Sequence, residues 1–573
     1  MKKKWKQSLI LLILTASLLI PSVSFQANAD EMHSISSVQN DYRLTSSIIA
    51  KVKSILNEQI PNGTRVAAVV RLYNEGVRVI RVPDYEVRVK TKEGIEYTLR
   101  PSVVNAKAIQ PKVTIELSYM IVVAREDAFS LSTLSWVDVD EYVYPKLEKP
   151  VLSIPIASIE WKGGNAVLSD PTANIKWGEV FAIPVLSSAI EYKAVSLDEQ
   201  NTPQGPVAII GLLATNMSEM KRSLPDLRID GTSDMKVYNG KRLELVNLVL
   251  DSGEQRYLHY AIPLGNGTKL KGLTILSPED FALDDQTNVN YTIGRLHITL
   301  PDDSNAMRFM APLLPYEWNK PIQFDSIYKW SQPEIDVSMV TLRMHESAGG
   351  GIKTAVAKFK LQNHSDHPLP VPHFQAQLRS TGGYQFTGTR QTTGVETLIP
   401  NISYVIYYSF VLPSTESGEQ LVMEIMDGET FAPYNIPIAA IRTQVQLEQG
   451  DTALAFYPFK VRLNNWSVGM NSGTSVGNLP YAYNLRMDLD ITPQSDVVAD
   501  QSFSKIKVEL VDAQGKTIGV KALLFTGENR LVSGMQTINI NSERFGSPLS
   551  LRIYETMDTP FGEADRLIQI LKP

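Results

Sequence analysis

Short segments of this chain alternate between apolar and polar residues with a period of two, as half-buried β-strands do. The clearest of these segments are Ala355–Gln362, Tyr404–Leu412 and Leu485–Thr492. Turn sequences such as Thr381-Gly382-Gly383 separate them. Many short strands joined by frequent turns predict an all-β protein built from sandwiches or barrels.

One segment has helical spacing instead. Between Leu44 and Gln59, apolar residues recur three and four positions apart, at Ile48, Ile49, Val52, Ile55 and Leu56. The sequence Pro61-Asn62-Gly63 follows and would stop a helix. We therefore expect one short helix in an N-terminal segment, residues 30–62.

Two stretches of the chain align without a gap at a constant offset of 289 residues, Ala68–Val122 and Ala357–Val411. A shorter match joins IPIASI, Ile154–Ile159, to IPIAAI, Ile436–Ile441. Matched identities in the long stretches include Leu72/Leu361, Asn74/Asn363, Val82/Val371, Pro83/Pro372, Gly94/Gly383, Thr98/Thr387, Pro111/Pro400, Tyr119/Tyr408 and Val122/Val411. An internal repeat of this length predicts an array of similar domains.

A fainter third copy is marked by the spacing of an asparagine and a proline. Pro225 follows Asn216 at the same distance that separates the pairs in the two clear copies. We expect a strand to end at the asparagine, whose side chain can cap a turn, and the proline to open the next strand. The closing strand of this copy is predicted at Gln255–Pro263.

The domain boundaries follow from the repeat and from Gly- and Pro-rich linkers. The C-terminal unit departs most from the pattern and is expected to be a diverged copy. The predicted division is a signal peptide (1–29), an N-terminal helical segment (30–62), sandwich domain 1 (63–159), domain 2 (160–315), domain 3, the repeat of domain 1 (316–441), and a diverged β-sandwich domain 4 (442–573).

The N-terminus has the pattern of a secretory signal. A lysine-rich start precedes the apolar run Ser8–Ile20, and Ala27-Asn28-Ala29 is an A-x-A cleavage site, so the mature chain is expected to begin at Asp30. A retained membrane anchor is the alternative, although the run is short for a spanning helix. The chain has no cysteine, whereas secreted eukaryotic modules usually carry disulfides. These features predict a secreted or cell-wall-associated protein of Gram-positive bacterial type.

Charge narrows the range of partners. The net charge of −6 includes four lysines of the signal segment, and the mature chain therefore carries −10. A negative chain without basic runs argues against nucleic acid and anionic membranes as partners. We expect no nucleic-acid binding, no membrane insertion after cleavage, and an unknown extracellular protein or cell-wall polymer as partner.

The opening pattern of strand, Asn, loop, Pro and aromatic residue (Asn74, Pro83, Tyr85 and Asn363, Pro372, Phe374) and the late strand Ile399–Pro413 resemble a known family. They are similar to the small immunoglobulin-like extracellular domains of exported Gram-positive bacterial proteins. The resemblance is best in domains 1 and 3. It implies tandem immunoglobulin-like sandwiches that serve for spacing or binding without catalysis, and it implies no particular site residue.

Side chains that could carry chemistry are few. His364, His367 and His373 lie close to Asp366 in one loop and have the ligand types of a zinc site. The equivalent loop of the first copy carries Glu75, Arg78 and Asp84, so the loop itself needs no ligands. We predict no metal site there. Calcium at domain joints remains an alternative for the acidic groups Asp138/Asp140/Glu141, Asp284-Asp285 and Asp302-Asp303.

The known catalytic motifs do not occur in usable form. There is no HExxH, GxGxxG or P-loop, and the S-x-x-K matches at Ser326 and Ser502 lack their companion elements. The sequence therefore predicts a protein without enzymatic activity and without a cofactor.

Tryptophans leave two interpretations open. Trp161, Trp177, Trp318 and Trp330 lie in or beside linkers, where they could lock neighbouring domains together. Exposed aromatic rings could instead stack on sugars. The residues predicted to contact a glycan in that case are Trp161, Trp466, Tyr481 and Tyr483. The preferred function is a non-enzymatic extracellular interaction or spacer module, and the alternative is a cell-wall or polysaccharide-binding protein.

Overall fold

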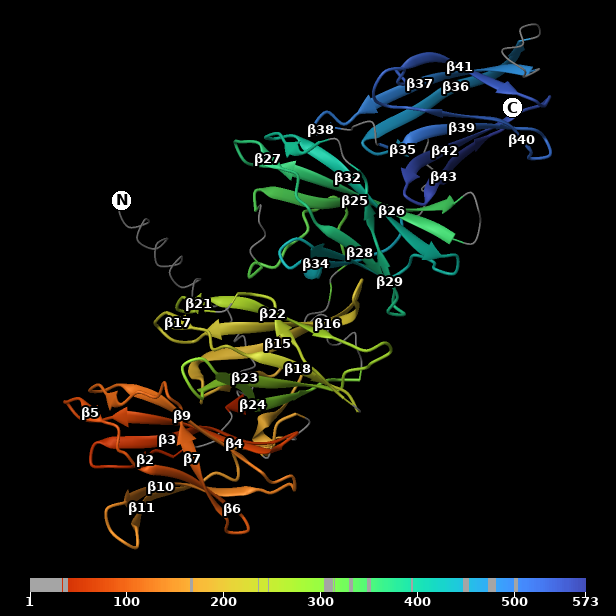
Figure 1. The fold of residues 1–573 in the computed structure, drawn as a ribbon. Helices are drawn as coiled ribbons and strands as arrows, with labels where there is room; N and C mark the ends of the chain where they lie inside the picture. The colour runs from red at the N-terminus through yellow and green to blue at the C-terminus, as the bar shows by residue number, and fades with distance from the viewer. Residues whose placement is uncertain are drawn as a thin grey trace, which may run out of the picture.

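The computed structural model describes residues 33–34 and 40–573, apart from 165–167, 169, 235, 246, 303–312, 314, 329–332, 348–351, 393–394, 447–452, 472–480 and 499–502. The predicted signal peptide lies outside the described residues. Four β-rich units follow one another along an elongated molecule (Figure 1). We call them unit 1 (40–161), unit 2 (170–302), unit 3 (315–446) and unit 4 (453–573). Each has a hydrophobic core of its own.

The all-β prediction is confirmed. Among the described residues, the regular structure is β apart from one 3₁₀ turn, Pro171–Ala173. Within that same part of the chain, no helix has the length and apolar character of a membrane span.

Every unit begins with a long hairpin and adds a third strand to form what we call its first sheet. In units 1 to 4 the hairpins are β3 (Ile48–Ile60) with β4 (Gly63–Asn74), β15 (Ser187–Thr202) with β16 (Gly205–Asn216), β25 (Ile335–Ser347) with β26 (Ile352–Asn363), and β36 (Phe459–Asn471) with β37 (Tyr481–Pro493). The third strands are β9 (Thr114–Val123), β22 (Gln255–Pro263), β32 (Ser403–Pro413) and β41 (Gly534–Ser542). The predicted closing strand of the third copy, Gln255–Pro263, is therefore confirmed.

Every unit ends with a second hairpin, here called the last hairpin, which belongs to the opposing sheet. The last hairpins are β10 (Leu131–Asp140) with β11 (Leu147–Pro155), β23 (Gly272–Ala282) with β24 (Asn288–Thr299), β33 (Leu421–Asp427) with β34 (Ile436–Thr443), and β42 (Ser550–Thr559) with β43 (Gly562–Leu571). Each pairs with a middle strand: β6 (Glu86–Thr91), β18 (Arg228–Thr232), β28 (Gln375–Arg379) or β39 (Lys505–Val511).

Shorter strands complete the edges of the sheets. They are β1 (His33–Ser34), β2 (Tyr42–Arg43), β5 (Ile80–Arg81), β7 (Glu96–Pro101), β8 (Ala108–Ile109), β12 (Glu160–Trp161), β13 (Asn174–Lys176), β14 (Val180–Ile183), β17 (Arg222–Ser223), β19 (Val237–Tyr238), β20 (Lys241–Arg242), β21 (Val249–Leu250), β27 (Leu369–Pro370), β29 (Gln385–Thr387), β30 (Thr389–Arg390), β31 (Thr397–Leu398), β35 (Ala453–Phe456), β38 (Val497–Val498) and β40 (Thr517–Leu523).

Two β-bulges recur at equivalent places in all four units. In the first hairpin the register shifts between Val52 and Ser54, and equivalent shifts occur in the other three units. In the last hairpin the shift follows Trp136 in unit 1 and Ile275, Ile425 and Ile553 in the others. Because a bulge is a specific local feature of a strand pair, eight matched bulges identify unit 4 as a copy of the same module.

The predicted N-terminal helix is wrong, because Ile48–Ile60 forms strand β3 of unit 1. Two causes produced the helical spacing. The bulge at Lys53 interrupts the alternation, and beyond it Ile55 and Leu56 are both buried, one against the core of unit 1 and the other against unit 2. Residues 40–62 therefore belong to unit 1 and supply its first long strand, whereas His33–Ser34 pairs with β14 of unit 2.

The predicted asparagine caps are confirmed, and they form what we call the asparagine clamp. The Asn74 amide donates to the carbonyl oxygen of Arg78 at 2.8 Å and of Ile109 at 3.0 Å, and its oxygen accepts from the Gly76 N–H at 2.8 Å. Asn216 and Asn363 make the same set of bonds in their own units. All three side chains are fully buried. Unit 4 has Pro493 at this position, so sequence matching found the copy only weakly.

One match of the repeat is out of register. The last-hairpin bulges pair Trp136 with Leu152 and Ile425 with Ala439, which makes Ile441 the counterpart of Ile154. The sequence match of IPIASI with IPIAAI, which pairs Ile154 with Ile436, therefore does not follow the structural equivalence of the two hairpins. The longer alignment stands, because Tyr119 and Tyr408 occupy the same place in β9 and β32.

Candidate functional site

The first joint of the array joins units 1 and 2 through a buried aromatic cluster. Trp161, in the short strand β12, pairs with β3 beside Leu56 and is 2% exposed. It packs with Phe281 and Tyr291 from the last hairpin of unit 2. A Cβ atom at Gly294 would lie 2.6 Å from the Trp161 ring, so only glycine leaves room for the tryptophan. Trp161 thus locks two domains together and has no face available for a sugar.

A buried ionic network completes the same joint. Glu279 of unit 2 accepts hydrogen bonds from Lys53 at 3.0 Å and from the Ser54 hydroxyl at 2.8 Å. Arg295 donates to Ser54 at 2.6 Å and to the Lys53 carbonyl at 3.0 Å. Burial lowers the pKa of Arg295 to about 10, which leaves it charged at neutral pH. The bulged Lys53 is the residue that reaches across, so the bulge is part of the joint.

The joint between units 3 and 4 repeats this chemistry with different residues. Glu555 in the last hairpin of unit 4 accepts from Lys358 of β26 at 2.7 Å and from Arg566 at 2.7 Å. His345 Nε2 lies 3.6 Å from the same carboxylate. All of these side chains are at most 5% exposed. Strand β25 also pairs with β43, so the first sheet of unit 3 and the last hairpin of unit 4 form one sheet.

Burial and charge set opposing pKa shifts in this network. Burial alone would raise the pKa of Glu555, but Lys358 and Arg566 lower it well below the ordinary value. Burial lowers the pKa of His345 below its usual 6.5, and the attraction of Glu555 offsets this only in part. Glu555 is therefore ionised and His345 neutral at neutral pH, which is the charge state that the buried pair requires.

The joint between units 2 and 3 is less tightly sealed. Ile436 in the last hairpin of unit 3 packs on Val207, Ile209 and Ala261 of the first sheet of unit 2. The ring of Phe431 lies 5.4 Å from that of His259. The Asn435 N–H donates to Gln200 Oε1 at 3.0 Å. Here too, the last hairpin of one unit contacts the first sheet of the preceding unit.

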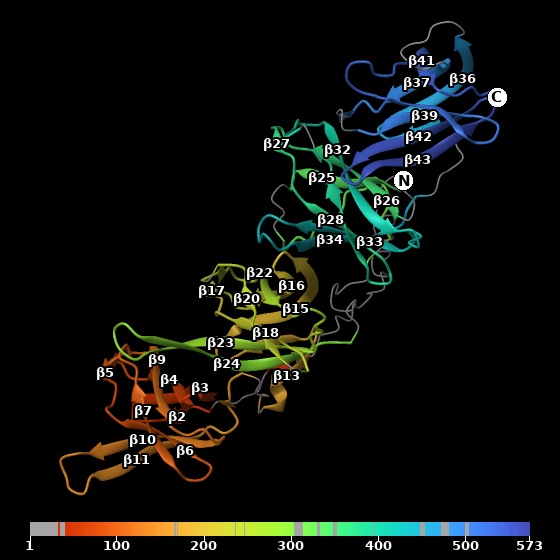
Figure 2. The same ribbon diagram turned by 45° about the vertical axis from the view of Figure 1, so that its right-hand side comes forward.

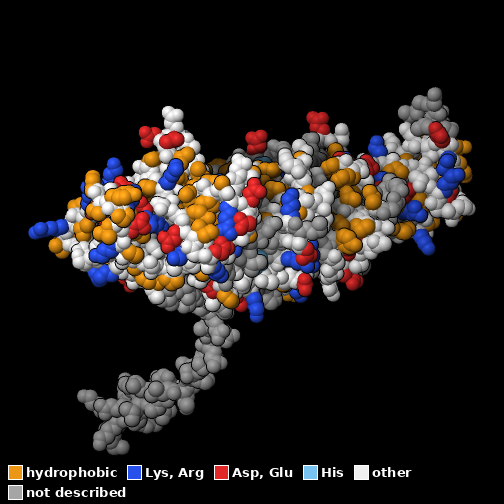
Figure 3. Space-filling model, turned by 60° about the horizontal axis from the view of Figure 1, so that its bottom comes forward, with side chains coloured by type: hydrophobic (Ala, Val, Ile, Leu, Met, Phe, Trp, Pro, Cys, Tyr) orange, Lys and Arg blue, Asp and Glu red, His pale blue; other side chains and the backbone are white. Residues whose placement is uncertain are grey.

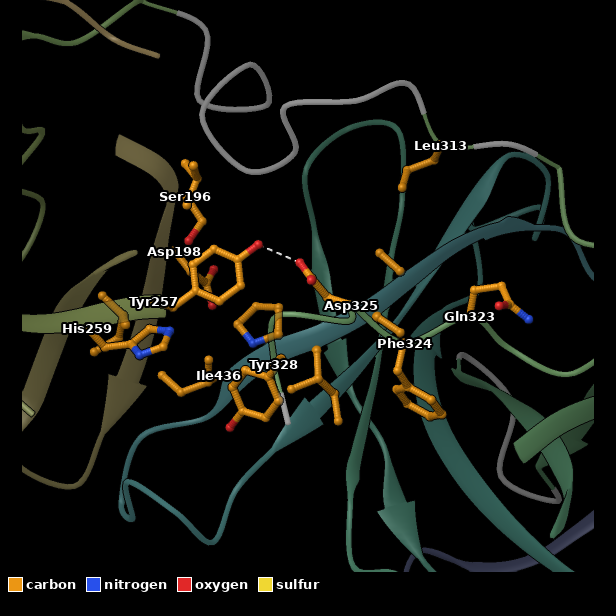
Figure 4. A pocket seen from close by; sticks show the side chains of 16 residues that line it. Ser196, Asp198, Tyr257, His259, Leu313, Gln323, Phe324, Asp325, Tyr328 and Ile436 are labelled. Carbon is orange, nitrogen blue, oxygen red and sulfur yellow. Dashed lines mark hydrogen bonds between the residues drawn. The ribbon is translucent and has the colours of Figure 1, made fainter. Parts of the chain in front are cut away.

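A cavity of about 490 Å³ lies beside this joint, with walls from both units (Figure 4). Tyr257 of unit 2 points across it and donates to Asp325 of unit 3 at 2.5 Å. Burial and this hydrogen bond raise the pKa of Tyr257. The His259 ring is engaged with Glu244 at 2.8 Å. The polar groups of the wall thus hold the joint, and the rest of the lining is largely apolar.

A second hollow, of about 510 Å³, lies on unit 4 and brings the predicted aromatic residues together. Trp466 and Tyr483 line it with Phe545, and Tyr481 lies against Phe545 at 5.9 Å between ring centroids. Tyr483 is 2% exposed, and its hydroxyl donates to the Arg544 carbonyl at 3.1 Å and accepts from the Gly546 N–H at 3.0 Å. Its role is to fix the loop under the hollow. Trp466 and Tyr481 are half-buried and keep part of their rings accessible.

Sequence reasoning missed Phe545, which is 57% exposed at the edge of this hollow. The sequence did contain a signal for this residue, because Gly546 and Pro548 directly after Phe545 indicate a surface loop. The other linker tryptophans are structural: Trp177 and Trp318 pack against the cores of units 2 and 3. Trp330 lies outside the described residues.

The candidate metal residues do not converge. His364 pairs with Asp336 at 2.8 Å, His367 with Asp366 at 3.0 Å, and the nearest carboxylate of His373 is 4.0 Å away on Glu429. Asp284 caps a turn by accepting the N–H groups of Gln286 and Thr287. Asp138 and Asp140 are exposed, and Asp303 lies outside the described residues. Across the described ranges, no three His, Asp or Glu side chains are placed to hold a metal ion.

No protein-family model matches the chain, and no curated protein matches it. Among solved structures it is similar to a protein of unknown function from Porphyromonas gingivalis W83, with 12% sequence identity and a TM-score of 0.15. The match covers 45% of this chain and 100% of that one. A score this low carries no argument about fold or function.

Proposed function

We propose that the chain is an exported, non-enzymatic protein that acts as an extracellular or cell-envelope spacer and interaction module. The observation that carries this proposal is the construction of the joints. Two of the three are sealed by buried ion pairs between neighbouring units, and all three have buried apolar contacts. Because such contacts resist bending, the four units would hold two ends of the molecule at a fixed separation.

The units themselves are proposed to be immunoglobulin-like sandwiches. Support comes from their two opposed antiparallel sheets and from the asparagine clamp that ties one strand end to a distant loop in units 1 to 3. Acidic and basic side chains are interspersed on the molecular face in Figure 3, as on a surface suited to protein contacts rather than to nucleic acid.

Cell fractionation tests the export part of the proposal. The full chain, carrying a C-terminal epitope and expressed in a Gram-positive host, is expected in the culture medium or the wall fraction, with residues 1–29 removed. Protease added to intact cells is expected to degrade any retained material. Recovery of the uncleaved chain from the cytosol would contradict the proposal.

A second candidate function, polysaccharide binding, is favoured by the aromatic hollow of unit 4. A tryptophan and a phenylalanine at one edge could hold a sugar ring, and half-buried Trp466 is the residue to test. Co-sedimentation of the mature chain (Asp30 onward) with insoluble cell wall and polysaccharides would show loss from the supernatant. Trp466→Ala should restore the soluble fraction, whereas the control Phe561→Ala, an exposed aromatic of unit 4 away from the hollow, should not. No loss of the unaltered chain on any matrix would exclude this function, and equal loss of all three proteins would exclude Trp466 as the contact.

A further inference from the structure

The last hairpins of units 2, 3 and 4 all do the same thing: each overhangs its own sandwich and covers the first sheet of the preceding unit. Within the described part of the chain, no other unit lies against the last hairpin of unit 1, β10 with β11. In Figure 2 it projects as a free arm from the end of the molecule. Residues 141–150 at its tip are exposed without exception.

The arm keeps the side chains that the other hairpins use for docking. With the bulges as reference, Tyr142 occupies the place of Phe281 in unit 2 and Phe431 in unit 3, both of which lie in a joint. Tyr142 is fully exposed, and Leu147 beside it is 63% exposed. An aromatic residue in open solvent, at a position that is buried in unit 2 and partly buried in unit 3, indicates a surface that is covered in use.

The charges of the arm match the same pattern. In the joints, a carboxylate of the last hairpin pairs with a lysine of the sheet it covers, Glu279 with Lys53 and Glu555 with Lys358. When the last hairpins are aligned on their bulges, Asp140 is equivalent to Glu279 and Asp138 is equivalent to Glu555. Asp138 has no ion-pair partner among the described residues. The arm thus offers two acids at the places where a docking hairpin meets a cation.

The opposite end of the array does not supply the missing partner. Among the described residues, no other unit covers the first sheet of unit 4, and this sheet carries Arg486 and Asp488 where unit 3 carries Val356 and Lys358. A second copy docked in the same manner would place Asp138 against Asp488. A polar outer face of this kind is typical of a terminal capping repeat. The two ends of the described array therefore differ: the sheet face of unit 4 is polar, whereas the last hairpin of unit 1 presents an aromatic and acidic docking surface.

We propose that the β10–β11 arm docks on the sheet face of a β-sandwich carried by another polypeptide, and that this face presents a small apolar residue beside a lysine. This inference deepens the proposed interaction role and rests on it. The internal joints are its model: the hairpins of units 2 and 3 place an aromatic residue on apolar sheet residues, and the hairpins of units 2 and 4 place an acid on a lysine of the sheet.

A graft on the full chain tests the arm without knowledge of the natural partner. The variant Arg486→Val, Asp488→Lys, Met535→Tyr copies onto unit 4 the residues Val356, Lys358 and Tyr407 that receive the unit 4 hairpin on unit 3. Size-exclusion chromatography with light scattering is expected to show the unaltered chain as a monomer. The graft should form head-to-tail oligomers whose mass rises at least twofold with concentration.

Arm variants decide whether the arm is responsible. Adding Tyr142→Ser and Asp138→Lys to the graft should return it to the monomer, whereas adding Tyr384→Ser, an exposed tyrosine of unit 3, should not. Thermal melts confirm that each variant is folded.

A folded graft that stays monomeric, or oligomers that survive the arm changes, would overturn the proposal. If the unaltered chain itself forms oligomers that depend on the arm, the partner of the arm is a second copy of this chain, and the proposal of a different polypeptide is overturned. These experiments test the docking of the arm, whereas the fractionation experiment tests export, so the two proposals can fail independently.

Discussion

At the scale of single residues, a few buried polar side chains determine where the backbone turns and where units meet. The asparagine clamp satisfies several backbone groups at once, and in units 1 to 3 one of its partners is the carbonyl group four residues after the asparagine. The sequence allowed this to be predicted because a strand-ending asparagine has few alternatives. Buried ion pairs such as Lys358–Glu555 could not be predicted, since a charged residue in a strand is ordinarily taken to face water.

Replacing a clamp tests its contribution to stability. Asn216→Ala leaves the carbonyl groups of Met220 and Leu250 and the N–H of Ser218 without their partner. Each orphaned buried group costs about 1–3 kcal/mol, so unit 2 should unfold at clearly lower urea concentration. Hydrogen–deuterium exchange of unit 2 peptides in urea measures this. Asn201→Ala, an exposed asparagine of the same unit, is the control and should leave the exchange unchanged.

The joint between units 3 and 4 should weaken in acid. His345 and Glu555 both have a folded-state pKa below the ordinary value, so the unfolded chain takes up protons first and stability falls as the pH decreases. The loss should begin below about pH 6.5, where His345 would titrate when unfolded, at up to about 1.4 kcal/mol per pH unit. A second loss should follow below about pH 4.5 through Glu555. Lys358 and Arg566 face both groups, and burial lowers the pKa of Lys358 while Glu555 opposes that shift.

Urea midpoints of the unit 3 and unit 4 peptides, measured by hydrogen exchange between about pH 7.5 and about pH 5, check the first loss. His345→Asn should flatten the profile in this interval. The exposed His364 serves as the matched control, and His364→Asn should leave the slope intact. An unchanged slope in His345→Asn would show that another group titrates.

At the scale of elements, strand identity was predictable wherever one face met a core and the other met water. The alternation in Leu485–Thr492 has its expected core face at Leu485, Met487 and Leu489, and Arg486 and Asp490 on the other face are exposed. Prediction failed at β3, where a bulge and a second buried face together imitate a helix. Both causes lie outside the local sequence, because the second buried face exists only when unit 2 is in place.

The close approach of Gly294 to Trp161 gives a test of the first joint. Gly294→Ala should clash with the indole and lower the stability of the joint by about 1–3 kcal/mol, as overpacking of a dense core does. Trp161→Leu in the same molecule should relieve most of that cost. Urea denaturation of the four members of this double-mutant cycle provides the measurement. Additive losses would mean that the two residues do not compete for space.

At the scale of the whole molecule, the same joint is used three times: the last hairpin of one unit covers the first sheet of the unit before it. The repeat along the chain could be found from sequence, but the direction and stiffness of the array could not. Those depend on overhanging hairpins and on cross-unit pairs such as Lys53–Glu279 and Lys358–Glu555, whose members are more than a hundred residues apart. Stiffness is the property that a spacer needs.

Breaking one ion pair should make the boundary between units 3 and 4 flexible. Glu555→Gln leaves Lys358 and Arg566 buried without their anion, at a cost of about 3–5 kcal/mol to the joint. Limited proteolysis should then cut the segment between units 3 and 4 much faster than in the unaltered chain. Glu563→Gln, an exposed carboxylate of the same hairpin, should not change the rate.

Small-angle X-ray scattering of the mature chain, Asp30 onward, tests the central claim most directly. A rigid array predicts one elongated particle whose scattering is reproduced by the four units in the arrangement of Figure 1, with a sharp maximum dimension that does not vary with ionic strength. Glu555→Gln should broaden the distance distribution. If the unaltered chain already scatters as an ensemble of freely hinged units, the joints do not hold the array and the spacer account is contradicted.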